Sequence, residues 1–252
     1  MAAAERVSAR SVFALRVGVV AFVLATWEVV SLSGLLFRDV VPSLGAIARA
    51  LARTLGSAEF YGNLAVTASE IGAALVIGGV AGLVVGIAFG SSRFLSRAYE
   101  PYVYYLGPTP KIIFFPVMIM WFGVASGSKI AMGAISCFFP IAISAAAGVR
   151  EIDEVLIRVG RSFRASPWQM ATRIYLPAMR AAVVNGLRLG LGVAIIGTLL
   201  AETKLSNRGV GYLIIQAYAT FDMPRMYALI IVLFVLSIGA NALLGRLADR
   251  RL

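Results

Sequence analysis

Histidine is absent from the sequence, and cysteine occurs only once, at Cys137. Without histidine the chain contains no Ser-His-Asp triad and no histidine metal site, and a single thiol excludes an internal disulfide or a thiolate cluster. No stretch has the G-x-x-x-x-G-K-S/T pattern of a phosphate-binding loop, so the chain does not bind ATP in that way. We therefore expect a protein that is not an enzyme and that binds no cofactor or metal of its own.

Charged side chains are also scarce: they make up 14% of the 252 residues, against roughly 25% in soluble domains. Apolar residues make up 60%, and the mean hydropathy is +0.88. Because a membrane span needs about 20 apolar residues, a chain of this length has room for roughly five or six spans. The predicted fold is an all-α membrane protein with about six transmembrane helices, forming one transmembrane domain over residues 1–252.

Arginine and lysine give the chain a net charge of +11. In a soluble protein this excess would suggest nucleic acid, but in a membrane protein the positive-inside rule and anionic lipid headgroups explain it better. With the N-terminus in the cytoplasm, about 14 basic residues fall on the inner side and about 7 on the outer side. We therefore expect both termini in the cytoplasm.

Six apolar segments are the expected spans, at residues 12–37, 63–90, 101–123, 128–149, 181–201 and 226–247. A short amphipathic helix over 44–55 should follow the first span, and residues 91–100 and 202–225 should be polar connections. The first span lacks a convincing small-residue cleavage site after it, so we interpret it as an uncleaved helix.

Glycine recurs at every fourth position of the second span, at Gly78, Gly82, Gly86 and Gly90. Such a row lies on one face of a helix and lets a neighbouring helix approach closely in lipid. Ordinary glycine use in a membrane helix is the alternative, but the four-residue register favours a packing role.

The third span contains Pro108, Pro110 and Pro116, so it must be kinked or broken. Broken membrane helices occur where neighbours or a water-filled cavity satisfy the freed carbonyls, which makes this span a candidate pathway wall. Lys111 is either a snorkelling end residue or a pathway residue. Simple helix packing is the alternative for the methionines and the tryptophan. The candidate pathway or gate residues are Pro110, Lys111, Met118, Met120 and Trp121, with Glu202 and Gln216 near the outer mouth.

Four arginines lie in the run from Arg158 to Pro177, between the fourth and fifth spans. A charged side chain at the centre of a bilayer costs about 2.5–3.5 kcal/mol or more, so this run must lie in water or among headgroups. Residues 151–163 are expected to be helical, and Ser166-Pro167 should begin a second short helix that ends before Pro177. A basic interfacial loop that only fixes topology explains these local features equally well. The apolar anchors expected on the membrane surface are Phe163, Trp168, Met170 and Ile174.

Over nearly its whole length, the chain resembles the integral-membrane permeases of bacterial ABC importers, in particular the nitrate/sulfonate/taurine group. These permeases carry a cytoplasmic loop of pattern E-A-A-x(3)-G-x(9)-I-x-L-P, and Ile174-Tyr175-Leu176-Pro177 matches its end at the required spacing. Each further match is weak alone, but their order along the chain is specific. They are Val41-Pro42-Ser43, Pro110-Lys111, Pro116, Trp121-Phe122-Gly123, Phe138-Phe139-Pro140, Ala165-Ser166, Trp168-Gln169, Ala201-Glu202 and Gly209-Val210-Gly211-Tyr212.

The resemblance implies a type I importer permease in the bacterial inner membrane, with a cytoplasmic coupling loop over 151–180. It also implies the partners: two nucleotide-binding ATPase subunits that hold ATP and magnesium, a second permease in a homodimer or heterodimer, and a periplasmic binding protein. The implied solute is a small anion such as a sulfonate, taurine or nitrate, with pyrimidine precursors and aromatic carboxylates as alternatives. The residues assigned to ATPase coupling are Arg158, Gly160, Arg161, Arg164, Ala165, Ser166, Pro167, Trp168, Ile174, Leu176 and Pro177.

The chain departs from the loop pattern at its first positions. Arg158 stands at the glutamate, Val159 and Gly160 stand at the two alanines, and Arg164 stands at the glycine. Two hypotheses follow. Either the cognate ATPase carries acidic residues that face Arg158 and Arg164, or this chain pairs with a second permease whose loop is intact.

Two other classes of function fit the sequence less well. A secondary carrier driven by an ion gradient would require paired intramembrane carboxylates or inverted repeats. Glu28, Glu70 and Glu202 read as scattered in the sequence, and no repeat is visible. A membrane-anchored scaffold would have no use for a span broken by prolines.

Overall fold

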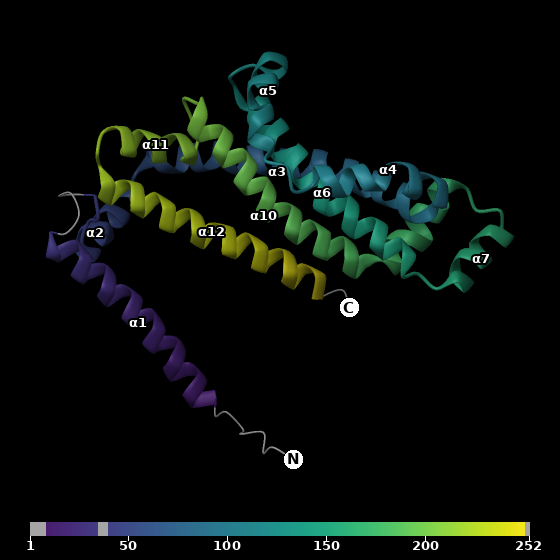
Figure 1. Ribbon diagram of the computed structural model, residues 1–252, viewed down its shortest axis with the longest axis horizontal. Coiled ribbons are helices and arrows are strands. Elements are labelled where there is room, and N and C mark those ends of the chain that lie inside the picture. The colour runs from purple at the N-terminus through teal and green to yellow at the C-terminus, as the bar shows by residue number, and fades with distance from the viewer. Residues whose placement is uncertain (1–8, 35–39, 250–252) are drawn as a thin grey trace. The chain divides into compact units, whose positions relative to one another are not determined.

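The computed structural model describes residues 9–34 and 40–249, and the regular elements within those ranges are helices (Figure 1). Five of the described helices are long and apolar enough to cross a membrane, and a bent pair brings the number to six. The predicted all-α membrane fold is therefore confirmed. The chain divides into two compact units, which we describe separately. The first unit consists of two segments, the described residues up to Ser57 and Ile214–Val232. The second unit consists of Ala58–Leu213 and the segment from Leu233 onward.

The first unit begins with α1 (Ala9–Ser33), an exposed apolar helix. The last part of the predicted first span, residues 35–37, lies outside the described ranges. The predicted amphipathic helix over 44–55 is confirmed as α2 (Leu44–Leu55), which begins at Ser43, the N-cap residue. The Glu28 carboxylate of α1 accepts a hydrogen bond from the first amide of α2 at 2.8 Å, so the two helices are joined at this end.

Three long helices form the core of the second unit: α3 (Ala58–Ser91), α6 (Ser126–Arg150) and α10 (Arg180–Lys204). They lie side by side in Figure 1. The glycine contacts along them show that α3 and α6 run in the same direction and that α10 runs in the opposite one. All three cover the spans predicted there and extend beyond them at both ends.

Each of these helices buries a row of residues four positions apart, as expected when helices pack along their i±4 ridges. On α3 the row includes the predicted glycine ridge. A Cβ on Gly82 or Gly86 would lie within 2.8 Å of a carbonyl oxygen of α6, and Gly78 and Gly90 face the same helix. The absence of side chains here therefore sets the close approach of α3 and α6.

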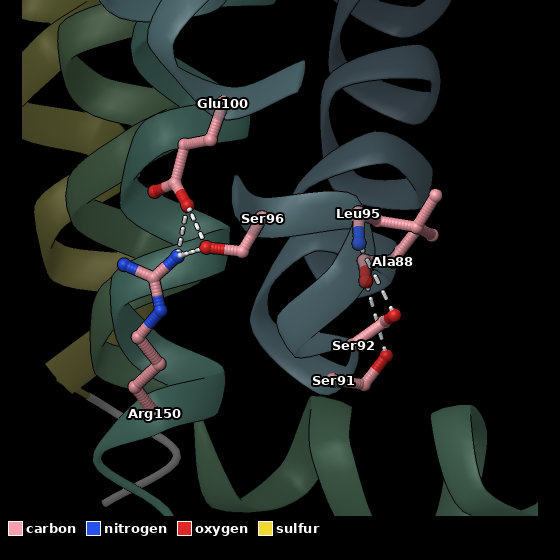
Figure 2. A network of polar contacts seen from close by, with 7 residues as sticks. All are labelled: Ala88, Ser91, Ser92, Leu95, Ser96, Glu100 and Arg150. Atoms are coloured by element: carbon pink, nitrogen blue, oxygen red, sulfur yellow. Dashed lines mark hydrogen bonds and ion pairs between the residues drawn. The ribbon is translucent and has the colours of Figure 1, made fainter. Parts of the chain in front are cut away.

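Residues 91–100 were expected to be a polar turn, and this is wrong, because most of them belong to α4 (Arg93–Leu106). The Ser92 hydroxyl accepts a hydrogen bond from the Leu95 amide at 3.3 Å and caps the new helix (Figure 2). Ser96 and Glu100 lie one turn apart on a single face of α4. The polar residues thus mark one side of an amphipathic helix rather than a turn.

The predicted break in the third span is confirmed. After α4 the chain forms a 3-10 turn over Lys111–Phe114 and then α5 (Phe115–Phe122), with a bend of 94°. The break falls at Gly107–Pro110, where two prolines remove helix hydrogen bonds. Pro116 lies in the first turn of α5, where a missing N–H would be unpaired in any case.

Residues 202–225 were expected to be a polar connection, and this is also wrong. The segment contains the end of α10, the whole of α11 (Val210–Ala219) and the start of α12 (Met223–Asp249). Glu202 misled the prediction because its side chain is fully buried and hydrogen-bonded inside the protein.

Candidate functional site

The base of the coupling loop is tied to the broken span by an ion pair between Arg150, the last residue of α6, and Glu100 of α4 (Figure 2). The Ser96 hydroxyl donates a hydrogen bond to the same carboxylate oxygen at 2.6 Å and accepts one from Arg150 at 3.2 Å. The Glu100 side chain is 8% exposed and that of Arg150 is 42% exposed, so the pair lies at the edge of the buried region. It fixes the point at which the chain leaves the spans.

The first helix of the loop, α7 (Glu154–Ser162), ends in a turn in which Arg164 has a φ of +52°. The Ala165 amide donates to the Gly160 carbonyl at 3.0 Å, and the Arg164 amide donates to the Arg161 carbonyl at 2.9 Å. These two bonds are the Schellman pattern, whose left-handed position is normally glycine. The family's glycine at this place is therefore explained by backbone geometry, and this chain places an arginine in the same conformation.

Ser166 and Pro167 begin the second helix of the loop, as predicted. The Ser166 hydroxyl accepts from the Gln169 amide at 3.2 Å, and the Gln169 side-chain oxygen accepts from the Ser166 amide at 2.9 Å, which completes a capping box. The expectation that this helix ends before Pro177 is wrong. A wider π turn relieves the clash of the proline ring with the preceding turn. The helical run consists of α8 (Pro167–Gln169), the π turn Met170–Tyr175 and α9 (Leu176–Ala178).

The inner face of the loop is continuous with the core of the spans. A Cβ on Gly160 would collide with the side chains of Met170 and Ile174, so α7 and the second helix pack closely at that point. Met170 is 7% exposed and Ile174 packs against the same cluster, so the expectation that they anchor the loop on a membrane surface is wrong. The loop therefore packs directly on α6. The buried cluster joining them contains Ala145, Val149, Ile152, Met170, Tyr175 and Met179.

The outer face of the loop is uncovered. The side chains of Phe163 and Trp168 are 82% and 76% exposed. Arg158 approaches Glu154 at 3.9 Å, but both side chains are more than 70% exposed, and such surface pairs contribute little. Two uncovered aromatic rings among arginines are the composition of a protein-docking face. Of the other residues assigned to coupling, Arg161, Arg164, Ser166, Pro167 and Pro177 are exposed, and Gly160, Ala165, Ile174 and Leu176 are wholly or partly covered.

Lys111 forms hydrogen bonds with the backbone at the break in the third span. Its ammonium group donates hydrogen bonds to the Gly107 carbonyl and, at 3.1 Å, to the Thr109 carbonyl. It also lies 4.9 Å from the centre of the Phe139 ring, within cation–π distance. Two backbone carbonyls at the break, those of Gly107 and Thr109, thus accept hydrogen bonds from a charged side chain of the same segment. Of the remaining pathway candidates on the third span, Pro110 lies at the break, Met118 is buried, and Met120 and Trp121 are exposed. Gln216 has a buried side-chain oxygen with no hydrogen-bond partner among the described residues.

Three charged side chains are buried together at one end of the three core helices. Glu70 of α3 is 2% exposed, Lys129 of α6 is 1% exposed and Glu202 of α10 is fully buried. The Glu70 carboxyl group lies near Glu202, and Lys129 lies near both. The interpretation of these glutamates as scattered is therefore wrong for Glu70 and Glu202.

Both carboxylate oxygens of Glu202 act as acceptors. The Thr67 hydroxyl donates to Oε1 at 2.7 Å, and the Gly211 amide donates to Oε2 at 2.6 Å. The Thr67 oxygen also accepts from the Val210 amide at 2.8 Å, so its own proton must point to Glu202. These hydrogen bonds hold the N-terminus of α11 against α3 and α10. Because the cluster is buried and hydrogen-bonded, it is a structural contact between helices rather than an open binding site.

The four-residue rows contain the signal that the sequence analysis missed. The glycine row on α3 continues backwards through Ala74 to Glu70, and the row on α10 continues from Gly186 to Glu202. Lys129 begins the corresponding row on α6. Following each row to its first charged residue would have placed the three charges on facing ridges.

Residues 78–252 match the family of binding-protein-dependent transport system inner membrane components, and the chain belongs to this family. It is 30% identical over 232 residues to a putative aliphatic sulfonates transport permease of Bacillus subtilis (strain 168), covering 92% of this chain and 84% of that protein. It is also 30% identical over 242 residues to the taurine transport system permease of Escherichia coli (strain K12), covering 92% and 88%. The chain is thus an ABC-importer permease of the inner membrane.

Among solved structures, the chain is similar to one chain of a structure titled "Inward facing conformations of the MetNI methionine ABC transporter", with a TM-score of 0.55. The two chains are 21% identical, and the match covers 82% of this chain and 94% of that one. At this identity the likeness concerns the fold alone. It confirms the predicted type I importer permease fold.

Proposed function

We propose that this permease carries a small organic sulfonate, delivered by a periplasmic binding protein, into the cell. The observation that supports this solute is the similarity, along 92% of the chain, to permeases named for aliphatic sulfonates and for taurine. A small anion is also the solute class that the family resemblance of the sequence implies. Pyrimidine precursors and aromatic carboxylates are the solutes to try next if sulfonates fail.

Transport is driven by a separate ATPase that docks on the outer face of the coupling loop. Phe163 and Trp168 are exposed there as two large apolar side chains, which suits insertion into a groove on a partner. Behind them, the inner face of the loop shares one buried cluster with α6. Closure of the ATPase dimer on ATP would move the docked helices, and the tight packing at Gly160 would pass that motion to the spans.

The working importer contains two permeases, two ATPase subunits that hold ATP and magnesium, and the binding protein. In this arrangement both termini of the permease and the loop over 151–180 lie in the cytoplasm, in agreement with the positive-inside count. No nucleotide binds to the permease itself. The spans contact lipid through the exposed apolar side chains of α1, α3 and α12.

Arg158 and Arg164 face acidic residues on the cognate ATPase. Both side chains are exposed on the loop, and neither has a buried carboxylate partner among the described residues. Arg158→Glu should lower coupling of ATP hydrolysis to uptake, and reversal of the facing acidic residue on the ATPase should restore it. Unaltered coupling in the single variant would refute this charge pairing and would favour a second permease with an intact loop.

The test of the proposed function is uptake by the purified complex. The tagged permease should retain an ATPase subunit through purification, and proteoliposomes holding the complex should accumulate labelled taurine or butanesulfonate only with ATP and the binding protein. Trp168→Ala should leave the permease folded but should uncouple hydrolysis from uptake. Uptake by the permease alone, driven by an ion gradient, would instead identify a secondary carrier. That outcome has structural interest because Glu70 and Glu202 are buried close together, with Lys129 near both.

A further inference from the structure

Arg188 is a charged residue inside a span without a charged partner. It lies on α10, about 12 Å along the helix axis from Arg180. Its Nε donates a hydrogen bond to the Asn241 side-chain oxygen of α12 at 3.0 Å. The described side chains include no carboxylate within ion-pair distance of it, and its terminal nitrogens have no hydrogen-bond partner among them. The Arg188 side chain is exposed, and a guanidinium at this depth in a span requires water or an anion beside it.

The same two helices enclose an apolar groove of about 350 Å³ that ends at Asn241. Leu191, Gly192 and Ile195 line it from α10, at helical spacings that continue the face on which Arg188 lies. Phe234 lines it from α12. The groove is thus mostly hydrophobic, with Ser237 in its lining and the Asn241 amide at one end. The Arg188 guanidinium lies just beyond that end, between Asn241 and Gly245.

We propose that Arg188, held in place by Asn241, binds the oxyanion group of the transported solute while the groove receives the solute's apolar tail. This inference rests on the proposed function and adds the site at which the sulfonate is recognised within the spans. The guanidinium supplies paired N–H donors that match the oxygens of a sulfonate. The apolar walls suit a short alkyl chain, which is the other half of an aliphatic sulfonate.

Asn241 is the positioning residue of this site. Its side-chain oxygen accepts from Nε and leaves the terminal nitrogens of Arg188 for the ligand. Asn241→Asp has nearly the same shape but puts a carboxylate against the guanidinium, so it should neutralise the site without opening a cavity. Arg188→Lys keeps the charge but loses the planar pair of donors.

The experiment uses the importer complex in proteoliposomes, with butanesulfonate and methanesulfonate as probes. Arg188→Gln and Asn241→Asp should each lower uptake of both sulfonates by about tenfold or more, since a charge-assisted hydrogen bond is lost. Arg188→Lys should retain part of the uptake. Wild-type uptake by both charge variants would overturn the proposal and would leave Arg188 as a residue that snorkels toward the interface.

A second pair of variants tests the groove without altering the charge. A Cβ on Gly192 has open space around it, so Gly192→Leu would fill the groove without a backbone clash. It should lower butanesulfonate uptake several-fold relative to methanesulfonate uptake. Gly239→Leu is the matched control, because Gly239 lies on α12 in open space and outside the groove lining. If the charge variants fail to assemble with the ATPase, this change in chain-length preference decides the question, and its absence overturns the proposal.

A lipid phosphate could offer the same chemistry as the sulfonate, and the lipid composition separates the two. In phosphatidylcholine vesicles without anionic lipid, the charge variants should still show the loss of sulfonate uptake. A defect that appears only with phosphatidylglycerol would assign Arg188 to a lipid headgroup and would overturn the solute site. If the wild-type complex moves no sulfonate under any condition, the proposed function fails. If the wild type moves sulfonate and the variants equal it, only the Arg188 site fails.

Discussion

Replacement of Glu202 by glutamine should destabilise the permease far more than the same replacement at Glu70. Glu202 is fully buried, and both of its oxygens must accept, one from the Thr67 hydroxyl at 2.7 Å and one from the Gly211 amide at 2.6 Å. A glutamine offers a single acceptor oxygen and turns an NH2 group toward one of these donors. One buried donor then loses its partner and faces a second donor.

The expected loss follows from these contacts. A buried polar group left without its hydrogen bond costs about 1–3 kcal/mol, and Lys129 also loses part of the negative charge beside it. A change of 1 kcal/mol moves the midpoint of thermal unfolding by about 2–4 °C in a chain of this size. Glu202→Gln should therefore lower the midpoint by about 2–12 °C. Glu70 has a buried oxygen, Oε2, with no hydrogen-bond partner among the described residues, so Glu70→Gln should cost much less.

Cys137 provides the assay. It is the only cysteine in the chain and is 0% exposed, so a thiol-reactive fluorescent dye should label it only when the core opens. Labelling is followed during a temperature ramp for wild type, Glu202→Gln and Glu70→Gln in the same detergent. Equal unfolding midpoints for the two variants would refute the argument that the hydrogen bonds accepted by Glu202 stabilise the contact between α3, α10 and α11.

Three further predictions concern the backbone. Arg164→Gly should raise the free energy of unfolding by roughly 0.5–1 kcal/mol, because glycine adopts a φ of +52° without strain. The same thermal assay measures this change, and a lower unfolding midpoint would contradict the assigned turn. Gly82→Leu should disrupt the contact between α3 and α6 and lower the unfolding midpoint. Gly72→Leu is the control, because a Cβ on Gly72 meets no atom within 4 Å. Equal midpoints for the two variants would rule out the close approach of α3 and α6 at Gly82. Lys111→Met should leave the Gly107 and Thr109 carbonyls without this hydrogen-bond donor, at a cost of about 1–3 kcal/mol. Limited proteolysis at the break should therefore become faster. Cleavage at the wild-type rate would argue against a role of Lys111 in capping these carbonyls.

Sequence reasoning predicted the features that depend on local chemistry. The amphipathic helix α2, the helix start at Ser166-Pro167 and the break at the prolines of the third span all follow from residues a few positions apart. The glycine row on α3 was also visible, because its period matches one face of a helix. These predictions succeeded because the physical cause lies within one or two turns of the chain.

The features that were missed depend on contacts between distant segments. Glu70 and Glu202 meet only because α3 and α10 pack on α6 with a particular register, which no local pattern specifies. The polar residues from Ser91 to Glu100 suggest a turn when considered locally, because Arg150, the partner of Ser96 and Glu100, lies far away in sequence. Pro177 was expected to stop a helix, and the π turn that accommodates it depends on the packing of Met170.

The side of the membrane on which Trp168 lies tests the central claim most directly. In a Cys137→Ala background, Trp168→Cys creates a single exposed thiol on the coupling loop, and a membrane-impermeant maleimide reports its side. We predict labelling in inside-out vesicles, protection when the ATPase is bound, and no labelling of intact right-side-out vesicles. Labelling from the outer face would contradict a loop that is moved by a cytoplasmic ATPase.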